Sequence, residues 1–359
     1  MLTRIQLRGF RCFSALRAEL PPGLSVFVGA NAQGKTSILE AIGVLMRLQS
    51  PRTVRLADLV QCGAEGFSVS GTFEGRNLQV SYAEGRRRQS CEGNPLSRGM
   101  DYLAEAGRVV WMGSDDRQLV RGSGSHRRRY LDFLASQLYS DYRPALVRYE
   151  RVLRARNALL RRNSRPDWAG IDAHDPILVR EGELLLRRRE DLSARLEGFV
   201  ADSYGAIGGA AEGFAMRYRP SVPRTAFGET LDRARQNDSV RRQTTVGPHR
   251  DGLDLEIGGR QAAMFASEGQ QRTLALALKL AQATLLKEAS GTDPLLLLDD
   301  VFGELDRDRR KALFAALPAT GQRVLTTTDL DWLPDYQHLE PALYRVARGA
   351  LHRLLTGAK

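Results

Sequence analysis

The hydrophobic and polar residues in the first part of the chain follow patterns that predict strands. Residues 3–7 alternate with a period of two, and residues 24–28 form an apolar run after a Pro-Pro-Gly turn. Residues 67–73 and 78–82, joined by a short polar segment with a glycine, predict a hairpin. From residue 37 the apolar positions take the spacing of a helix. This part of the chain therefore predicts an antiparallel sheet beside a strand, a glycine-rich loop and a helix.

The middle of the chain changes to a helical pattern that is rich in Arg, Leu and Ala. Its spacing predicts helices over 144–162 and 177–200. Strand patterns return at 253–257, 295–298 and 324–326, with a helix predicted over 270–287. We therefore expect an α/β fold with a mixed sheet and an antiparallel β subdomain, interrupted by an inserted helical domain. The predicted boundaries are 1–115 and 243–359 for the discontinuous domain and 116–242 for the helical insertion.

Composition and charge narrow the class of protein. The 359 residues include 53 Lys and Arg against 42 Asp and Glu, which gives a formal net charge of +11. Such an excess favours a polyanionic partner, either nucleic acid or an anionic membrane surface. No apolar run approaches the ~20 residues of a transmembrane helix, and the N-terminus lacks the pattern of a signal peptide. The three cysteines have no CxxC spacing, which disfavours a disulfide framework and a zinc site, so we expect a cytoplasmic protein.

A glycine-rich loop after the strand at 24–28 matches the G-x-x-x-x-G-K-[ST] pattern in full. The glycines allow backbone N–H groups to point at phosphate oxygens, and the following helix adds the positive end of its dipole. Lys35 is predicted to reach the β- and γ-phosphates of ATP, and Thr36 to bind Mg²⁺. The alternative is a glycine loop that matches by chance. The predicted nucleotide-binding residues of this loop are Gly29, Ala30, Asn31, Ala32, Gln33, Gly34, Lys35, Thr36 and Ser37.

Two acidic residues follow the apolar run at 295–298 and complete the predicted catalytic set with Lys35. Asp299 is expected to bind Mg²⁺, directly or through water, and Asp300 to orient or deprotonate the attacking water. The alternative role of Asp300 is to cap the next turn. Since Lys35 and Asp299 lie 299 − 35 = 264 residues apart, a sizeable insertion is expected between the two halves of the site.

A second anion site is predicted where the helix over 270–287 begins. The loop before it carries Ser267, Gly269 and Gln270, and a helix N-terminus offers free N–H groups. This helix is roughly 27 Å long, which would place the loop far from the glycine-rich loop of the same molecule, so its phosphate would belong to another molecule. An ordinary N-cap serine is an equally good interpretation of Ser267.

These motifs together resemble the ATP-binding-cassette (ABC) head of the SMC class of P-loop ATPases. Further segments resemble the RecF family of bacterial recombination mediators. They are Gly9-Phe10-Arg11, Arg52-Thr53, the segments 119–132 and 245–251, and 299–306. The resemblance implies an ATP-dependent homodimer in which Ser267 and Gly269 close on the γ-phosphate bound by the other subunit. It also implies that Asp306 lies at the dimer interface and that Thr327 or Thr328 contacts the γ-phosphate.

The same resemblance implies a role in DNA repair, with binding to duplex DNA near single-strand gaps. RecR and RecO are the implied partners. RecA is an indirect partner, because the protein is implied to help RecA load together with RecR and RecO. Several arginine clusters, such as 86–88 and 127–129, agree with phosphate contacts of little sequence preference, although a single cluster is usually a solvated helix face. His249 is a candidate for a phosphate or partner contact, but a lone histidine is more often structural.

Five residues depart from the family's pattern, and two of them, Gly113-Ser114, replace the usual Ser-Pro. Glu268 brings a carboxylate into the loop at Ser267, where it would repel phosphate unless it points outward. Arg117 replaces a leucine after the acidic pair Asp115-Asp116. Asp300 stands where most cassette ATPases carry glutamate, and its shorter side chain suggests slow hydrolysis.

The leading hypothesis is a weak, DNA-dependent and Mg²⁺-dependent ATPase whose nucleotide state controls dimerisation on DNA. One alternative is a nucleotide-gated DNA clamp with negligible turnover. Another is the ATPase subunit of a cassette transporter, which predicts a histidine after the strand at 324–326 and a short helical insertion. The sequence has threonines and a long basic insertion instead, so no membrane partner is expected.

Overall fold

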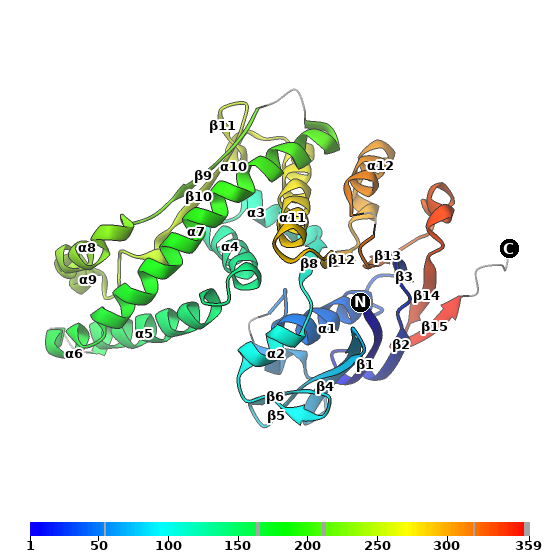
Figure 1. The fold of residues 1–359 in the computed structure, drawn as a ribbon, viewed down its shortest axis with the longest axis horizontal. Helices are drawn as coiled ribbons and strands as arrows, with labels where there is room; N and C mark the ends of the chain where they lie inside the picture. Colours follow the sequence, from blue (N-terminus) through cyan, green and yellow to red (C-terminus); the bar gives the residue numbers. More distant parts are fainter. Residues whose placement is uncertain (54, 163–165, 210–212, 319, 355–359) are drawn as a thin grey trace. The chain divides into compact units, whose positions relative to one another are not determined.

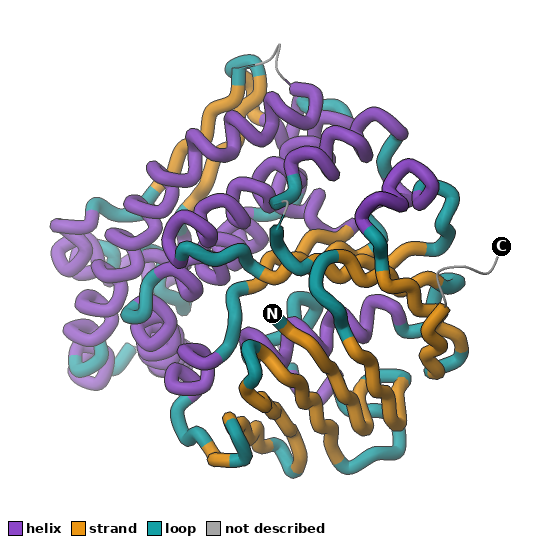
Figure 2. Tube along the Cα trace, turned by 45° about the vertical axis from the view of Figure 1, so that its right-hand side comes forward, coloured by secondary structure: helices purple, strands orange, loops and turns teal. Residues whose placement is uncertain are grey.

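The computed structural model describes residues 1–53, 55–162, 166–209, 213–318 and 320–354. The chain divides into two compact units, which we call the P-loop unit, Met1–Asp115 with Leu286–Lys359, and the helical unit, Asp116–Leu285 (Figure 1). Most of the strands belong to the P-loop unit, and helices predominate in the other (Figure 2). The expected α/β fold with an interrupted first domain is confirmed.

An antiparallel sheet forms the N-terminal part of the P-loop unit, with the strand order β2-β1-β4-β5-β6-β7. Its strands are β1 Leu2–Phe10, β2 Phe13–Glu19, β4 Gly66–Phe73, β5 Arg76–Ala83, β6 Arg86–Cys91 and β7 Asn94–Pro95. The predicted hairpin is β4 with β5, paired from Gly66 opposite Ala83 to Phe73 opposite Arg76. Alternation sends the apolar side chains of β1, β4 and β5 to the face that packs on helix α1, Lys35–Arg47, and leaves polar side chains on the other face.

A mixed sheet forms the second part of the P-loop unit, with the order β15-β14-β3-β13-β12-β8. Its strands are β3 Leu24–Val28, β8 Val109–Gly113, β12 Leu295–Asp299, β13 Arg323–Thr327, β14 Ala342–Ala347 and β15 Ala350–Leu354. All but β15 are parallel, and β12 is buried on both faces, as its run of leucines predicts. Since parallel strands end at the same edge, the residues that follow β3, β12 and β13 lie along one edge of the sheet. The unit also contains α2 Gly99–Glu105 and α12 Arg307–Ala316.

Two long helices form the frame of the helical unit, α5 Tyr142–Arg162 and α7 Asp175–Tyr204, which pack on each other. They extend the predicted helices by a few residues at their ends. The shorter helices are α3 Arg117–Arg121, α4 Gly124–Leu138, α6 Trp168–Asp172, α8 Phe227–Arg233, α9 Arg235–Arg241 and α10 Ala262–Phe265. A small antiparallel sheet contains β9 Phe214–Arg219, β10 Gly252–Ile257 and β11 Arg260–Gln261. Short 3₁₀ turns lie at Leu56–Leu59, Ser114–Asp116, Arg224–Ala226, Pro248–Arg250, Phe302–Glu304 and Leu333–Leu339.

The second domain boundary differs from the predicted one. The inserted unit begins at 116, as expected, but it ends at 285 instead of 242. The reason is the pairing of β10 with β9 over six residue pairs, from Gly252 opposite Arg219 to Ile257 opposite Phe214, which draws the segment after 242 into the helical unit. Helix α11, Glu268–Ser290, begins in the helical unit and ends in the P-loop unit.

A buried arginine joins two segments of the helical unit, 127–132 and 245–251, which belong to the stretches that resemble the RecF family. Arg189 on α7 is 2% exposed and donates to Asp132 Oδ1 at 2.7 Å, Asp251 Oδ2 at 2.8 Å and Pro248 O at 2.6 Å. Its Nε also donates to Tyr142 Oη at 2.9 Å. Burial by itself lowers the pKa of Arg189, but the surrounding oxygens outweigh burial and hold that pKa well above its ordinary value. The segments 127–132 and 245–251 therefore meet at one charge cluster.

His249 is part of the same buried region. Its Nε2 lies 3.0 Å from Thr244 O and its Nδ1 lies 2.7 Å from Tyr149 Oη. A carbonyl accepts only, so Nε2 carries the proton and Nδ1 accepts from the tyrosine hydroxyl. Burial lowers the pKa of His249 to about 4, so the ring is neutral at pH 7. Both ring nitrogens are used within the helical unit, which favours the structural role over a phosphate contact.

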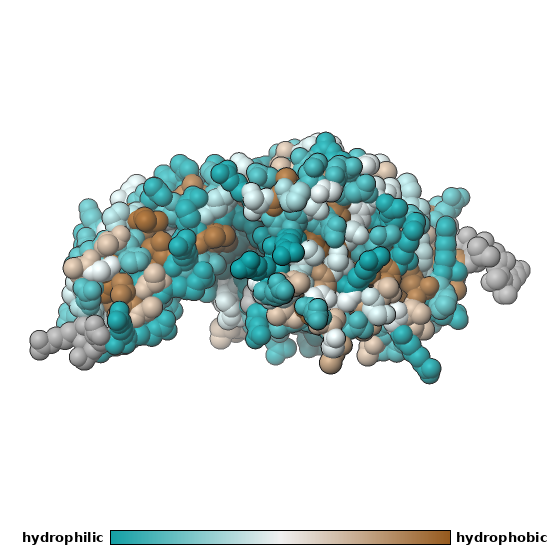
Figure 3. All heavy atoms as spheres, turned by 90° about the horizontal axis from the view of Figure 1, so that it is seen from below, coloured by the Kyte–Doolittle hydropathy of each residue, from teal (hydrophilic) through white to brown (hydrophobic). Residues whose placement is uncertain are grey.

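Among the helices of the described residues, none is both long and apolar enough to cross a bilayer. On the face of the molecule drawn in Figure 3, hydrophilic side chains predominate and the hydrophobic ones form small separate groups.

Candidate nucleotide-binding site

The glycine-rich loop links the end of β3 to the start of α1, and two of its glycines are required by their surroundings. A Cβ atom on Gly29 would lie 2.3 Å from Val346 O, so a side chain does not fit there. Gly34 has a φ of 102°, and its Cβ would lie 2.6 Å from Cys12 Sγ. Ala32 also takes a left-handed conformation, with a φ of 62°. These turns give the loop the curled backbone that phosphate-binding nests use.

The side chain of Lys35 lies across this loop. Its Nζ donates to Gly29 O at 2.7 Å and to Ala30 O at 2.9 Å, and the residue is 6% exposed. Burial lowers the pKa of Lys35, while the nearby carboxylates of Asp300 and Asp299 raise it. The ammonium group is therefore held at the loop, next to the two acidic residues that end β12.

Thr36 and Asp299 come together although they are far apart in the sequence. Thr36 Oγ1 donates to Asp299 Oδ1 at 2.8 Å, and Thr326 Oγ1 on β13 donates to the same oxygen at 2.8 Å. Burial raises the pKa of Asp299, and these two hydrogen bonds only partly offset that effect. Two hard oxygen ligands at this point suit Mg²⁺, which usually takes few protein ligands and completes its shell with water and phosphate oxygens. The described residues contain no cluster of three or more His, Cys, Asp or Glu that could hold a metal by itself.

Asp300 has an unusual backbone and an unpaired carboxylate oxygen. Its φ is 53°, and its N–H donates to Thr326 O at 3.2 Å, which turns the residue off the end of β12. Among the described residues its Oδ1 is buried without a hydrogen-bond partner. A side chain that capped the following turn would accept a backbone N–H, so the capping alternative is not favoured. A buried carboxylate oxygen that lacks a hydrogen-bond donor is suited to accept a hydrogen bond from a bound water.

A cavity of about 600 Å³ opens beside the loop. The predicted residues that line it are Asn31, Ala32, Gly34, Lys35, Thr36, Ser37, Asp299 and Asp300. The remaining lining residues are Arg11, Cys12, Arg52, Asp58 and Val60. The sequence indicated Arg11 and Arg52 only as parts of family-like segments, with no role assigned.

A buried glutamate orients the two arginines at this cavity. Glu40 on α1 is fully buried and accepts from Arg11 Nε and Nη2, both at 2.8 Å. Arg52 Nη1 lies 3.5 Å from Glu40 Oε2, the oxygen that also accepts from Arg11 Nε. Arg52 also lowers the pKa of Asp299, so its charge acts on the end of the site that contains Asp299. The sequence carries little sign of this cluster, because Glu40 lies within a predicted helix and its two arginine partners lie in other segments of the chain.

Four predicted loop and strand-end residues do not line the cavity. Gly29 and Ala30 provide the carbonyl groups that hold Lys35. Gln33 turns outward, where its Oε1 accepts from Arg348 N at 2.6 Å. Thr328 is exposed after β13, and Thr326, which the prediction passed over, is the threonine that contacts Asp299.

Asp306 and the loop at Ser267 occupy helix N-termini. Asp306 Oδ1 accepts from Arg309 N at 2.8 Å and caps α12. Ser267 and Gln270 form a capping box at α11, in which Ser267 N donates to Gln270 Oε1 at 2.7 Å and Gln270 N donates to Ser267 Oγ at 3.2 Å. The N-cap interpretation of Ser267 therefore applies. In this role the hydroxyl only accepts, so its own proton stays available for a further acceptor.

The chain is similar to known proteins over nearly its whole length. A family model described as "RecF/RecN/SMC N terminal domain" matches residues 1–333. The DNA replication and repair protein RecF of Heliobacterium modesticaldum is 36% identical over 364 residues, which cover 97% of this chain and 98% of that protein. RecF of Anaeromyxobacter sp. (strain Fw109-5) is 38% identical over 373 residues, with 99% and 100% covered.

Solved structures agree with these relatives. A structure described as the recombination mediator protein RecF with ATP, in the RecFOR pathway, has a TM-score of 0.88 and 27% identity, with 99% of this chain and 97% of that chain covered. An SMC head bound to the C-terminal winged-helix domain of ScpA has a TM-score of 0.56, 15% identity and coverage of 99% and 98%, and it shares the fold. The chain therefore belongs to the RecF family of DNA replication and repair proteins.

Proposed function

We propose that this chain is an ATP-dependent DNA-binding protein of recombinational repair, in which ATP drives the association of two copies. The observation that carries the proposal is the contact between Thr36 and Asp299 beside the glycine-rich loop, which supports these two residues as the ligands of one Mg²⁺ ion. The ATP named for a RecF structure at 27% identity supports the choice of nucleotide. Membership of the RecF family leaves no support for the transporter alternative.

The residues of the cavity have separate roles in this proposal. The backbone from Gly29 to Gly34 and the ammonium group of Lys35 bind the β- and γ-phosphates. Thr36 and Asp299 hold Mg²⁺, which stabilises the charge on the phosphates when it is bound. Asp300 accepts a proton from a water whose oxygen attacks the γ-phosphorus as the bond to the bridging oxygen breaks. Since the Asp300 side chain is one methylene shorter than glutamate, we expect slow, DNA-dependent hydrolysis that resets the dimer.

The loop at Ser267 supplies the second half of the phosphate site in trans. The capping box already orders Ser267, Gly269 and Gln270, so little entropy is lost when a phosphate binds there. The hydroxyl proton of Ser267 and the N-terminal N–H groups of α11 are the donors. Asp306 and Thr328, both exposed, are proposed to take part in the same interface.

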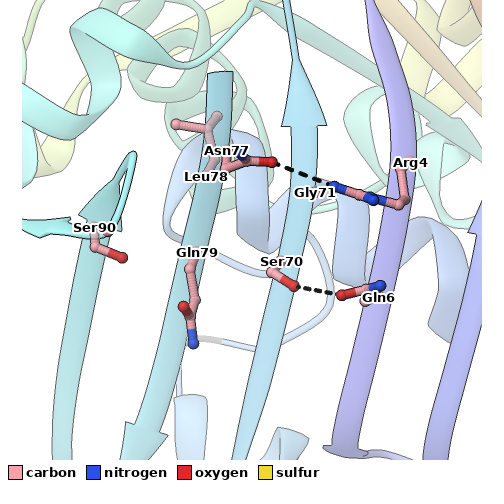
Figure 4. Close-up of a pocket in the computed structure, with 9 residues that line it drawn as sticks. Arg4, Gln6, Ser70, Gly71, Asn77, Leu78, Gln79 and Ser90 are labelled. Carbon is pink, nitrogen blue, oxygen red and sulfur yellow. Dashed lines mark hydrogen bonds between the residues drawn. The ribbon is translucent and has the colours of Figure 1, made fainter. Parts of the chain in front are cut away.

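The polar face of the antiparallel sheet is the proposed DNA surface. Register places Arg8, Ser68, Ser81 and Arg88 in one row across β1, β4, β5 and β6. A neighbouring row, which includes Gln6, Ser70 and Gln79, borders a hollow of about 210 Å³ (Figure 4). Arg4 at this hollow points toward Asn77, with Nη2 3.4 Å from Oδ1. Basic and neutral polar donors without sequence-reading elements suit the phosphate backbone of duplex DNA and gap junctions.

The remaining partners follow from the family alone. A solved RecF structure is described as belonging to the RecFOR pathway, and the resemblance to the RecF family implies RecR and RecO as partners. We propose that this chain, bound to duplex DNA near a single-strand gap, acts with both to help RecA load.

Sedimentation velocity tests the proposed ATP-driven dimer. The wild-type chain is expected to change from monomer to dimer with ATP and Mg²⁺, and to stay monomeric with ADP, because only ATP offers a γ-phosphate to the second copy. The Lys35→Met variant, which lacks the phosphate-binding ammonium group, is the control and is expected to stay monomeric with ATP. A wild-type chain that remains monomeric with saturating ATP would contradict the proposal.

The salt dependence of DNA binding tests the sheet surface. Replacing Arg8 or Arg88 by alanine is expected to weaken binding to all duplexes alike and to reduce the slope of log K against log salt by about 1 for each arginine removed. Among the described residues neither arginine forms an ion pair. The matched control is Arg233→Ala on α8, since Arg233 is exposed and already paired with Glu229 at 3.0 Å. Unchanged slopes for the sheet variants would exclude this face.

A further inference from the structure

Two of the three charged departures from the family's pattern lie next to each other. Glu268 is the first residue of α11, inside the loop Ser267–Gln270, and Arg117 begins α3. The Arg117 Nη1 atom lies 3.8 Å from Glu268 Oε1, although 151 positions separate the residues (268 − 117). Both residues belong to the helical unit, where α3 packs on α10, the helix that directly precedes the loop.

Glu268 has opposite effects on the helix and on the ligand. A carboxylate in the first turn stabilises a helix, because it complements the positive end of the dipole. The same carboxylate repels a phosphate that approaches the N–H groups of this turn. Its side chain is 70% exposed, so burial does not prevent it from facing a ligand.

Arg117 is placed to cancel this repulsion. Its side chain is only 35% exposed, which shows that the packing of α3 covers much of its length. Its neighbour Asp116 pairs with another residue, since Asp116 Oδ1 is 2.8 Å from Lys279 Nζ. The arginine charge therefore remains next to the loop and close to the carboxylate.

We infer that Arg117 is a positioning residue for the loop at Ser267: it holds the Glu268 carboxylate away from the phosphate-binding side and neutralises its charge. A second copy of this chain, with its bound nucleotide, then meets a loop without net negative charge. This inference rests on the proposed ATP-driven dimer. It explains why the arginine and the glutamate occur together in this chain.

A double-mutant cycle on dimer formation tests the inference. The quantity measured is the ATP concentration that gives half-maximal dimer in sedimentation. Arg117→Leu is expected to raise it by about 1.5-fold to 5-fold, the range for an exposed ion pair. In the Glu268→Gln background the same change is expected to have little effect, because no carboxylate remains to be neutralised. Arg117→Lys is expected to dimerise at an ATP concentration close to that of the wild type. High salt is expected to reduce the effect of Arg117→Leu.

Several outcomes separate this inference from the proposal on which it rests. If Arg117→Leu weakens the dimer equally in both backgrounds, the arginine has only a structural role and the inference is wrong. The inference alone is also overturned if the wild type dimerises with ATP and none of the variants differs from it. If the wild type does not dimerise, the proposed function fails and the inference fails with it. Thermal unfolding of each variant checks that the helical unit stays folded.

Discussion

Replacing Asp300 by asparagine is expected to slow ATP hydrolysis by roughly 100-fold or more in single-turnover experiments, the usual contribution of a general base. The amide keeps the shape of the side chain but accepts a proton poorly. The buried Oδ1, which has no donor among the described residues, loses the negative charge that would hold and activate a water. ATP-driven dimer formation should remain, since Asp300 does not bind the phosphates in our proposal.

Two comparisons make the Asp300 result specific. Asp308→Asn, on the exposed side of α12, is a matched control that should hydrolyse ATP at the wild-type rate. Asp299→Asn should impair nucleotide binding as well as hydrolysis, because it removes a proposed Mg²⁺ ligand. Equal and near-zero rates for the wild type and Asp300→Asn would instead favour the DNA clamp with negligible turnover.

Replacing Arg189 by methionine is expected to destabilise the helical unit by about 3–5 kcal/mol, the usual cost of breaking a buried ion pair from one side. Methionine has a similar length but leaves Asp132 and Asp251 without their guanidinium partner. It also removes the donors to Tyr142 and Pro248 O. The result is read as a lower midpoint in urea or heat unfolding, with roughly 2–4 °C lost per kcal/mol for a unit of this size.

The adjacent residue provides the control for Arg189. Arg188 on the same helix pairs with Asp141 at 2.7 Å, but both side chains are partly exposed, at 28% and 37%. Arg188→Met should therefore cost no more than about 1 kcal/mol. If the two methionine variants unfold at the same midpoint, the buried cluster does not stabilise the unit in the way its geometry indicates.

Local patterns in the sequence predicted the parts of the site that depend on adjacent residues. The curl of the glycine-rich loop depends on the positive φ of Gly34, and the apolar run before Asp299 needs no distant partner to be recognised as a strand. The order strand, loop and helix then placed Lys35 and Thr36. These features are local because backbone sterics and helix dipoles act over a few residues.

Features that depend on distant pairing were missed or misplaced. The strands β8, β14 and β15 were not predicted, because short segments acquire strand character only when they join the sheet. The domain boundary at 242 was wrong by 43 residues (285 − 242), because β10 pairs with β9 across a long intervening segment. The contacts of Glu40 with Arg11 and of Glu268 with Arg117 join segments whose separate patterns carry no sign of the partner.

The strand order of the mixed sheet has a consequence for how the chain folds during its synthesis. The antiparallel sheet is complete once residue 95 has emerged, and its contacts are local. In contrast, among the described strands β3 pairs only with β13 and β14, and β13 begins 295 positions after Val28 (323 − 28). At ~5–20 residues per second, the ribosome takes roughly 15–60 s to deliver that partner. The β3 edge that carries the glycine-rich loop therefore has no sheet partner until most of the chain has been synthesised, so the phosphate-binding loop is among the last parts of the P-loop unit to be supported by its sheet.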